Sequence, residues 1–264
     1  MLAVVRKNRV LAQLEQKGAV RTRELAQTLG VVPETIRRDL FELEQKGLVR
    51  RIHGGAVTPS SGEIESPASI REGTNTGVKN ELCRAAATQV RDGDLIFVDN
   101  SSTLLHLARH IDDSRTVSVL TNSVRLLLEA QRLNQPNVTM ISTGGILSTY
   151  NLSLSGQLDG GFADALFPTK AFVSCTGFSL ESGFTDTSVF EINIKRRMIS
   201  AGARFIMVMD HSKFEKRGLV KIGNLKDCDM LITDHLPGEI YRGKLLAMHP
   251  ALQIIETDAM IDQV

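Results

Sequence analysis

Seven short apolar segments rich in β-branched residues recur in the later part of this 264-residue chain, and they constrain its fold more than any other feature. They cover residues 94–99, 117–122, 138–143, 170–175, 204–210, 230–234 and 252–256. Helical patterns separate most of them, at 104–111, 123–133 and 190–202. Alternating strands and helices predict an α/β fold with a mainly parallel sheet that helices cover on both faces.

The junctions that follow these strands are the places to look for a ligand site, because open α/β sheets bind ligands outside the carboxyl ends of their strands. Small, hydroxylated or charged residues recur at five junctions: Asp99–Thr103, Thr121–Ser123, Ser142–Gly145, Cys175–Phe178 (with 182–186 following) and Asp210–Phe214. Hydroxyls and free N–H groups at a helix N-terminus bind anions, and Lys213 can neutralise one. Any one junction is ordinary cap or turn chemistry, but together they predict a site for a phosphorylated or hydroxylated small ligand.

The first 57 residues carry a different pattern, of short helices. Apolar spacing predicts helices over 6–17 and Arg23–Leu29, and a third that starts at Pro33. Thr22 can cap the second helix, Gly30 can end it with a positive φ, and Pro33 suits the first position of the third. Two short helices joined by a tight turn predict a helix-turn-helix over about residues 20–39.

The third helix places apolar residues at spacing i, i+4, i+7, namely Ile36, Leu40 and Leu43. On a helical wheel this turns Arg38 outward and leaves Thr35 and Arg37 on the flanks. The segment LVRRIHGGAV that follows predicts a β-hairpin with a Gly-Gly turn, which makes the motif winged. The second helix of such a motif enters the major groove of DNA, where arginine can contact guanine or phosphate.

Charge separates the two parts of the chain. Residues 1–57 hold 11 Lys/Arg against 6 Asp/Glu, whereas the remainder is net acidic. A basic head on an acidic body predicts that the head alone meets a polyanion, although uneven surface charge or a solvated amphipathic helix would give the same composition. We expect domains at 1–57 and 73–264, with 58–72 as a polar, proline-containing linker.

Other chemistry has weaker support. Cys83, Cys175 and Cys228 are dispersed, which suits reduced thiols in a cytoplasmic protein, and neither a signal peptide nor a membrane-spanning run is apparent. His106 and His110 are four residues apart but lack the glutamate and third ligand of a metal site. Glu191, Lys195 and Arg196 could form a catalytic cluster, but charged residues along one helix more often form solvated ion pairs, which is what we expect here. We therefore expect no cofactor, no metal and no catalytic residue.

The stretch VRTRELAQTLGVVPETIRRDLFELEQKGLVRRIHGGA, residues 20–56, closely resembles the DNA-binding domain of the DeoR family of bacterial regulators of sugar metabolism. The resemblance implies that Thr35, Arg37 and Arg38 read DNA. It implies further contacts, chiefly to the DNA backbone, from Thr22, Arg23, Arg51 and His53. Where the family usually has a capping Ser, this chain has Val32, so we expect a recognition helix that is less stable by about 1 kcal/mol or less.

The C-terminal part resembles the effector domain of the same family, which is related in fold to ribose-5-phosphate isomerase. The resemblance implies a bound sugar phosphate, with its phosphate in the Asn100–Thr103 loop, where the family's usual Gly is absent. The implied effector contacts are Lys79, Asp99, Asn100, Ser101, Ser102, Thr103, Thr121, Asn122, Gly144, Gly145, Gly177, Glu191, Lys195 and Lys213. Other matching positions are Gly156, Thr185, Asp210, Thr233 and Asp234.

These observations predict a cytoplasmic transcriptional regulator, by family default a repressor of carbohydrate catabolism genes. A homodimer or homotetramer would bind duplex operator DNA and be released by a sugar phosphate or related metabolite. One alternative is an isomerase-like enzyme with a DNA-binding head, using acids such as Asp99, Asp186 and Glu191. Another is a constitutive DNA-binding scaffold without an effector, if the missing Gly has abolished the pocket.

Overall fold

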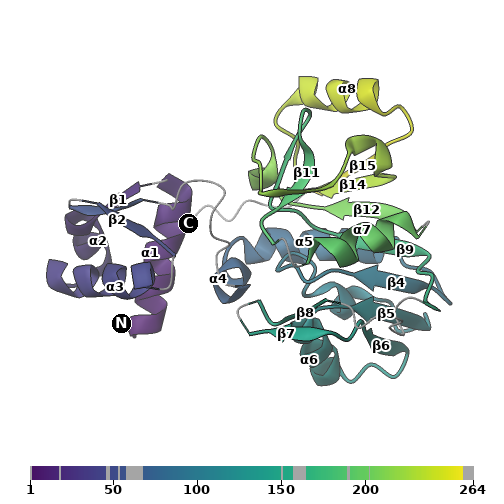
Figure 1. The fold of residues 1–264 in the computed structure, drawn as a ribbon, viewed down its shortest axis with the longest axis horizontal. Helices are drawn as coiled ribbons and strands as arrows, with labels where there is room; N and C mark the ends of the chain where they lie inside the picture. The colour runs from purple at the N-terminus through teal and green to yellow at the C-terminus, as the bar shows by residue number, and fades with distance from the viewer. Residues whose placement is uncertain are drawn as a thin grey trace. The chain divides into compact units, whose positions relative to one another are not determined.

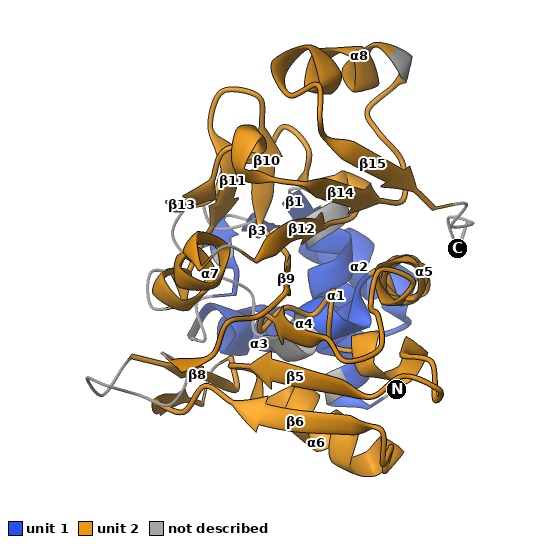
Figure 2. Ribbon diagram, turned by 90° about the vertical axis from the view of Figure 1, so that its right-hand side faces the viewer, with its two compact units in different colours: residues 1–74 blue, residues 75–264 orange. Residues whose placement is uncertain are grey.

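The computed structural model describes residues 2–17, 19–45, 48–52, 54–57, 68–149, 151–156, 165–188, 191–201 and 203–257. The chain divides into two compact units, residues 1–74 and 75–264, and each is described by itself (Figures 1 and 2). Most of the predicted linker lies outside the described residues. Its last residues, 68–72, lie in the short helix α4 (Ala68–Gly73).

Unit 1 is a three-helix domain with a small antiparallel sheet in the order β1-β3-β2. Its elements are α1 (Ala3–Lys17), β1 (Ala19–Arg21), α2 (Thr22–Leu29), α3 (Pro33–Gln45), β2 (Arg50–Ile52) and β3 (Gly55–Val57). The predicted helices, turn and wing are therefore present, while β1 was not predicted. Ile36, Leu40 and Leu43 are buried on α3 as their spacing predicts, against Val10 and Leu14 of α1.

The turn between α2 and α3 follows from its glycine. Gly30 has a φ of 65°, its N–H donates to the Gln27 carbonyl, and the Val31 N–H donates to the Ala26 carbonyl. These two bonds form the usual glycine-ended helix terminus. The predicted cap at Thr22 is wrong. Helix α2 has no side-chain cap, and the Thr22 backbone N–H donates instead to the carbonyl of Gly54 in the wing.

Unit 2 is built on a seven-stranded sheet in the order β15-β14-β12-β9-β4-β5-β6, in which every neighbouring pair is parallel. All seven predicted strands are present. They are β4 (Leu95–Val98), β5 (Val117–Thr121), β6 (Val138–Ser142), β9 (Lys170–Val173), β12 (Arg204–Val208), β14 (Met230–Thr233) and β15 (Gln253–Glu256).

Both faces of this sheet are covered, as the continuous apolar strands predict (Figure 1). Phe97 and Met207 pack on one face, in a cluster that includes residues of α7 (Ile192–Ser200) and α8 (Glu239–Met248). Ile96 and Val98 pack on the other, with residues of α5 (Thr76–Ala87) and α6 (Val124–Leu133).

Smaller elements complete unit 2. A second sheet has the order β10-β11-β13, and a hairpin pairs β7 with β8. Their bounds are β7 (Ile146–Ser148), β8 (Ser153–Ser155), β10 (Gly177–Ser179), β11 (Gly183–Asp186) and β13 (Val220–Gly223). The predicted helix at 104–111 is wrong, because turns lead there into a short 3₁₀ helix, η1 (Leu107–His110). No helix in the described part of the chain combines the length and apolar character that crossing a bilayer needs.

Candidate functional site

The order of the strands marks one point of the sheet. From β4 the chain proceeds through β5 to β6 in one direction, whereas from β9 it proceeds through β12, β14 and β15 in the other. Strands β4 and β9 are neighbours, so the sheet has its topological switch point between them, where ligands of open α/β sheets bind. Asp99 follows β4 and Ser174 follows β9, which brings both to this point.

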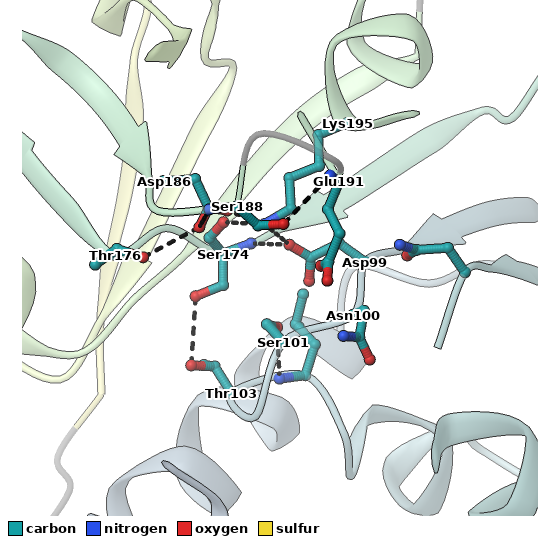
Figure 3. Close-up of polar contacts among 12 residues, drawn as sticks. Asp99, Asn100, Ser101, Thr103, Ser174, Thr176, Asp186, Ser188, Glu191 and Lys195 are labelled. Atoms are coloured by element: carbon teal, nitrogen blue, oxygen red, sulfur yellow. Dashed lines mark hydrogen bonds and ion pairs between the residues drawn. The ribbon is translucent and has the colours of Figure 1, made fainter. Parts of the chain in front are cut away.

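A buried lysine organises the switch point (Figure 3). Lys195, which α7 supplies, is 3% exposed. Its Nζ lies 2.8 Å from Asp99 Oδ2 and 2.5 Å from Asp186 Oδ2, and it donates to the carbonyl of Ser174 at 3.2 Å. The Ser174 N–H donates to the same Asp99 oxygen at 3.0 Å. The cluster thus joins the ends of β4, β9 and β11 to helix α7.

Burial disfavours a charge on Lys195, but the carboxylates of Asp186, Asp99 and Glu191 outweigh it and raise the pKa of the ammonium. Lys195 therefore stays charged at neutral pH. A buried ion that loses its partner is strongly destabilising, by about 3–5 kcal/mol. Lys195, Asp99 and Asp186 therefore stabilise the fold as well as forming a candidate ligand site.

One oxygen of this cluster has no hydrogen-bond partner among the residues that the structure describes. Asp99 Oδ1 is buried and accepts no hydrogen bond from any described residue, whereas Oδ2 has both Lys195 and the Ser174 N–H. An unsatisfied buried acceptor costs about 1–3 kcal/mol, so a bound group that donates a hydrogen bond there would be favoured. A hydroxyl is such a donor.

A second network links Glu191 to the β7–β8 hairpin. Ser153 Oγ donates to Glu191 Oε1 at 2.6 Å, and the Asn151 side-chain amide donates to the same oxygen at 3.1 Å. The Asn100 amide donates to the Asn151 carbonyl at 3.2 Å. The hairpin therefore contacts both the loop after β4 and the start of α7.

The Asn100–Thr103 loop already uses much of its hydrogen-bonding capacity. Ser101 Oγ accepts from the Leu104 N–H at 3.2 Å, and Thr103 Oγ1 accepts from Ser174 Oγ at 3.3 Å. Ser102 Oγ accepts from Lys79 Nζ at 3.1 Å and is half-buried. Because an α-helix does not follow this loop, the expected anion site at a helix N-terminus is not formed here.

Other predicted residues lie at the neighbouring strand ends. Thr121 ends β5 and Asn122 follows it. Both are fully buried, and Thr121 Oγ1 accepts from the Ser123 N–H. Lys213 lies in η3 (His211–Lys213) after β12. Burial raises the pKa of Asp210, but Lys213 and hydrogen bonds from Ser212 outweigh this and hold that pKa below its usual value.

Two of the predicted glycines lie close to neighbouring backbone. A side chain on Gly145 would lie 2.6 Å from the Gly156 carbonyl, and one on Gly177 would lie 2.5 Å from the Lys216 backbone. The missing Cβ atoms thus allow close packing of the chain against itself at these two positions. Gly144, with a φ of 70°, has open space instead and serves the turn.

The expectation of solvated ion pairs on α7 is wrong, because Glu191 and Lys195 are both buried and only Arg196 is exposed. Four residues of the site were not among the predicted effector contacts: Ser174, Asp186, Asn151 and Ser153. Asp186 ends a strand in the noted segment 182–186, which was the available indication. The sequence carries no comparable indication for the hairpin residues.

In unit 1, the predicted DNA-contacting residues are mostly accessible. The side chains of Arg38 and Arg37 are 83% and 61% exposed, with Glu42 and Glu34 as their ion-pair partners on the same helix. Arg23 is also exposed, and Thr35 is half-buried.

Arg51 of the wing pairs with Glu44 at 3.7 Å, and its guanidinium lies 5.6 Å from the ring centre of Phe41. His53 lies outside the described residues. Thr22 is only 6% exposed, which leaves little of it for DNA.

Comparison with known proteins agrees with this two-part architecture. Residues 74–235 match the DeoR C terminal sensor domain, and residues 6–62 match the DeoR-like helix-turn-helix domain. The chain is a DNA-binding transcriptional regulator rather than an enzyme. It belongs to the DeoR family.

Its relatives include an uncharacterized HTH-type transcriptional regulator of Bacillus subtilis, which is 36% identical over 89% of this chain and 90% of its own length. The glycerol-3-phosphate regulon repressor of Escherichia coli is 28% identical over 88% and 91%. The L-fucose operon activator of Haemophilus influenzae is 30% identical over 88% and 93%.

Among solved structures, ribose 5-phosphate isomerase A of Methanocaldococcus jannaschii aligns with 53% of this chain and 55% of its own, at 14% identity and a TM-score of 0.40. A likeness at this level concerns the fold alone.

Proposed function

We propose that this regulator is a repressor whose operator affinity falls when a sugar phosphate binds at the switch point between β4 and β9. The observation that carries the proposal is the buried, unpartnered Oδ1 of Asp99, which a sugar hydroxyl can satisfy. Lys79 of α5 donates to Ser102 in the loop after β4 at 3.1 Å, and these two side chains suit a phosphate. The relatives support the ligand class, since one is a glycerol-3-phosphate regulon repressor.

On the DNA side, we propose that α3 enters the major groove and that Arg38, Arg37 and Thr35 contact bases or phosphates. Arg23 and Arg51 would contact the DNA backbone and set the position of the head. The exposure of the arginine side chains supports this arrangement. The buried Thr22 is left out of the proposed contact set.

We further propose that two or four copies act together, since helix-turn-helix proteins usually bind repeated half-sites. Effector binding would weaken the operator complex through a coupling free energy of about 1–3 kcal/mol, which is about 5–150-fold in affinity. The predicted linker at 58–72 would transmit the change.

The test combines thermal melting with operator binding. The full-length protein is melted with a panel of sugar phosphates, the matching free sugars and inorganic phosphate, because a ligand that binds only the native state raises the melting temperature. The ligand that gives the largest shift is then added to an operator complex. We expect one sugar phosphate, but not its free sugar, to raise the melting temperature and lower operator affinity.

Two neighbouring serines supply a matched pair of variants. Ser102→Ala removes the hydroxyl that faces Lys79, so the ligand-induced shift should shrink. Ser101→Ala removes a hydroxyl that accepts from the Leu104 N–H, so the shift should persist although basal stability falls. A panel in which no sugar phosphate changes either melting or operator affinity would refute the proposal.

A further inference from the structure

Three potential metal ligands meet at the carboxyl ends of β12 and β14, next to Asp210 and Lys213 in the sequence. Asp234 directly follows β14, His235 comes next, and His211 opens η3 two residues after Met209. Each residue offers one ligand atom, and these atoms lie within 4.8 Å of one another. The strands that carry them are neighbours in the sheet (Figure 1).

The carboxylate of Asp234 is oriented before any ligand arrives. It is 4% exposed. Its Oδ1 accepts from the His211 backbone N–H at 2.6 Å and from the Thr233 hydroxyl at 3.3 Å. Its Oδ2 contacts His211 Nδ1 and lies 3.3 Å from His235 Nδ1. Oδ1 is thus held by two hydrogen bonds from the protein, and Oδ2 faces two imidazole nitrogens. In metal sites, similar hydrogen bonds from outside the ligand set orient the ligands.

The two imidazoles share one geometry. Their ring centroids are 4.2 Å apart and their planes differ by 20°, so they stack and present the same nitrogen atom, Nδ1, to one oxygen. Their side chains are 34% and 44% exposed, so an ion and a water molecule can reach them from solvent.

We propose that His211 Nδ1, His235 Nδ1 and Asp234 Oδ2 bind a divalent transition metal of the zinc type, with water in the fourth position. Two imidazoles and one carboxylate match the donors that zinc prefers, whereas magnesium and calcium prefer oxygen alone. Zinc–nitrogen distances are about 2.0–2.1 Å, so the two imidazoles would turn out of their stacked arrangement to direct both Nδ1 atoms at one ion.

Competing donors in the described chain are poorly suited to the same ion. Burial raises the pKa of the thiols of Cys83, Cys175 and Cys228, which keeps them protonated. His110 Nε2 is hydrogen-bonded to Asn80. The proposed metal site and the proposed sugar-phosphate site use different residues, so each can be tested without the other.

The test is a cobalt(II) titration of the full-length, metal-free protein followed by visible absorption, with zinc competition and calorimetry for stoichiometry. We expect one ion per chain and the absorption of a four-coordinate nitrogen–oxygen site. His235→Ala should weaken binding more than about tenfold, since even substitutions outside the ligand shell cost about 10–100-fold. His110→Ala is the matched control and should bind cobalt as the wild type does.

Asp234→Asn gives a second variant in case His235→Ala unfolds, because the amide oxygen can still accept the His211 N–H while the anionic ligand is lost. It too should weaken binding more than tenfold. The proposal fails if the wild-type protein develops no cobalt absorption, if both ligand variants bind cobalt as tightly as the wild type, or if His110→Ala abolishes binding.

Discussion

The two units of this chain place their charged side chains in opposite environments, exposed in one and buried in the other. On α3 of unit 1, Arg38 is 83% exposed and pairs with Glu42 at 3.5 Å. At the switch point of unit 2, Lys195 is 3% exposed and lies between two carboxylates. Exposed ion pairs contribute about 0–1 kcal/mol to folding stability, so their charged groups can separate and bind another molecule instead. A buried charge must be compensated inside the fold. The first arrangement suits contact with a large polyanion, and the second suits a small ligand held by a rigid frame.

The largest expected effect tests the buried half of this comparison. Lys195→Met should lower the free energy of unfolding by about 3–5 kcal/mol, because Asp99 and Asp186 lose the cation that compensates them. Urea unfolding measures the change. Arg196→Met, one residue along the same helix, removes an exposed charge and should cost far less. Equal losses in the two variants would remove the distinction between buried and exposed cations.

An intermediate effect tests the exposed half. Arg38→Ala should weaken operator binding by about 1–3 kcal/mol without changing the melting temperature appreciably, since its side chain is largely solvated in the free protein. Fluorescence anisotropy at a fixed salt concentration, on a duplex selected from random sequences, measures the affinity. Arg132→Ala, an exposed arginine on α6 of unit 2, is the control for net charge. If both variants bind alike, Arg38 is not a DNA contact.

The smallest effect sharpens the comparison within unit 1. Val32 precedes α3, is 64% exposed and has no oxygen in its side chain to accept the first free N–H groups of the helix. Val32→Ser should therefore raise the free energy of unfolding by up to about 1 kcal/mol in thermal unfolding. Val32→Ala shortens the side chain without adding an acceptor, so it should give no such gain. A serine variant no more stable than the alanine variant would contradict the capping argument.

Sequence pattern predicted the large sheet well because its strands are buried on both faces and therefore appear as continuous apolar runs. Strand β1 and the strands of the two smaller sheets escaped prediction, since three or four residues leave too short a pattern. The helix predicted at 104–111 was wrong for another reason. Leu104, Leu107, Ala108 and Ile111 have helical spacing and are all buried, but turns and a 3₁₀ helix bury them equally well.

The site was predictable only where it lies at strand ends. Asp99 and the loop after it follow an evident strand, so the rule for α/β sheets located them. The partners of Lys195 were not predictable. Asp99 lies far from it in the sequence, and Asp186, although only 9 residues away, belongs to a separate short strand, β11. The same holds for Asn151 and Ser153, which reach Glu191 only once the hairpin has folded against α7.

The hydrogen bond from the Thr22 N–H to the Gly54 carbonyl limits the ways in which an effector could lower the affinity for DNA. This hydrogen bond connects the wing to the start of α2, and β1 pairs with β3 beside it. Arg6 of α1 also donates two hydrogen bonds to Asp39 of α3. A DNA-binding domain held together by these contacts resists changes in its internal conformation. If two or four copies act together as proposed, effector binding would then change the spacing between DNA-binding domains rather than the shape of each one.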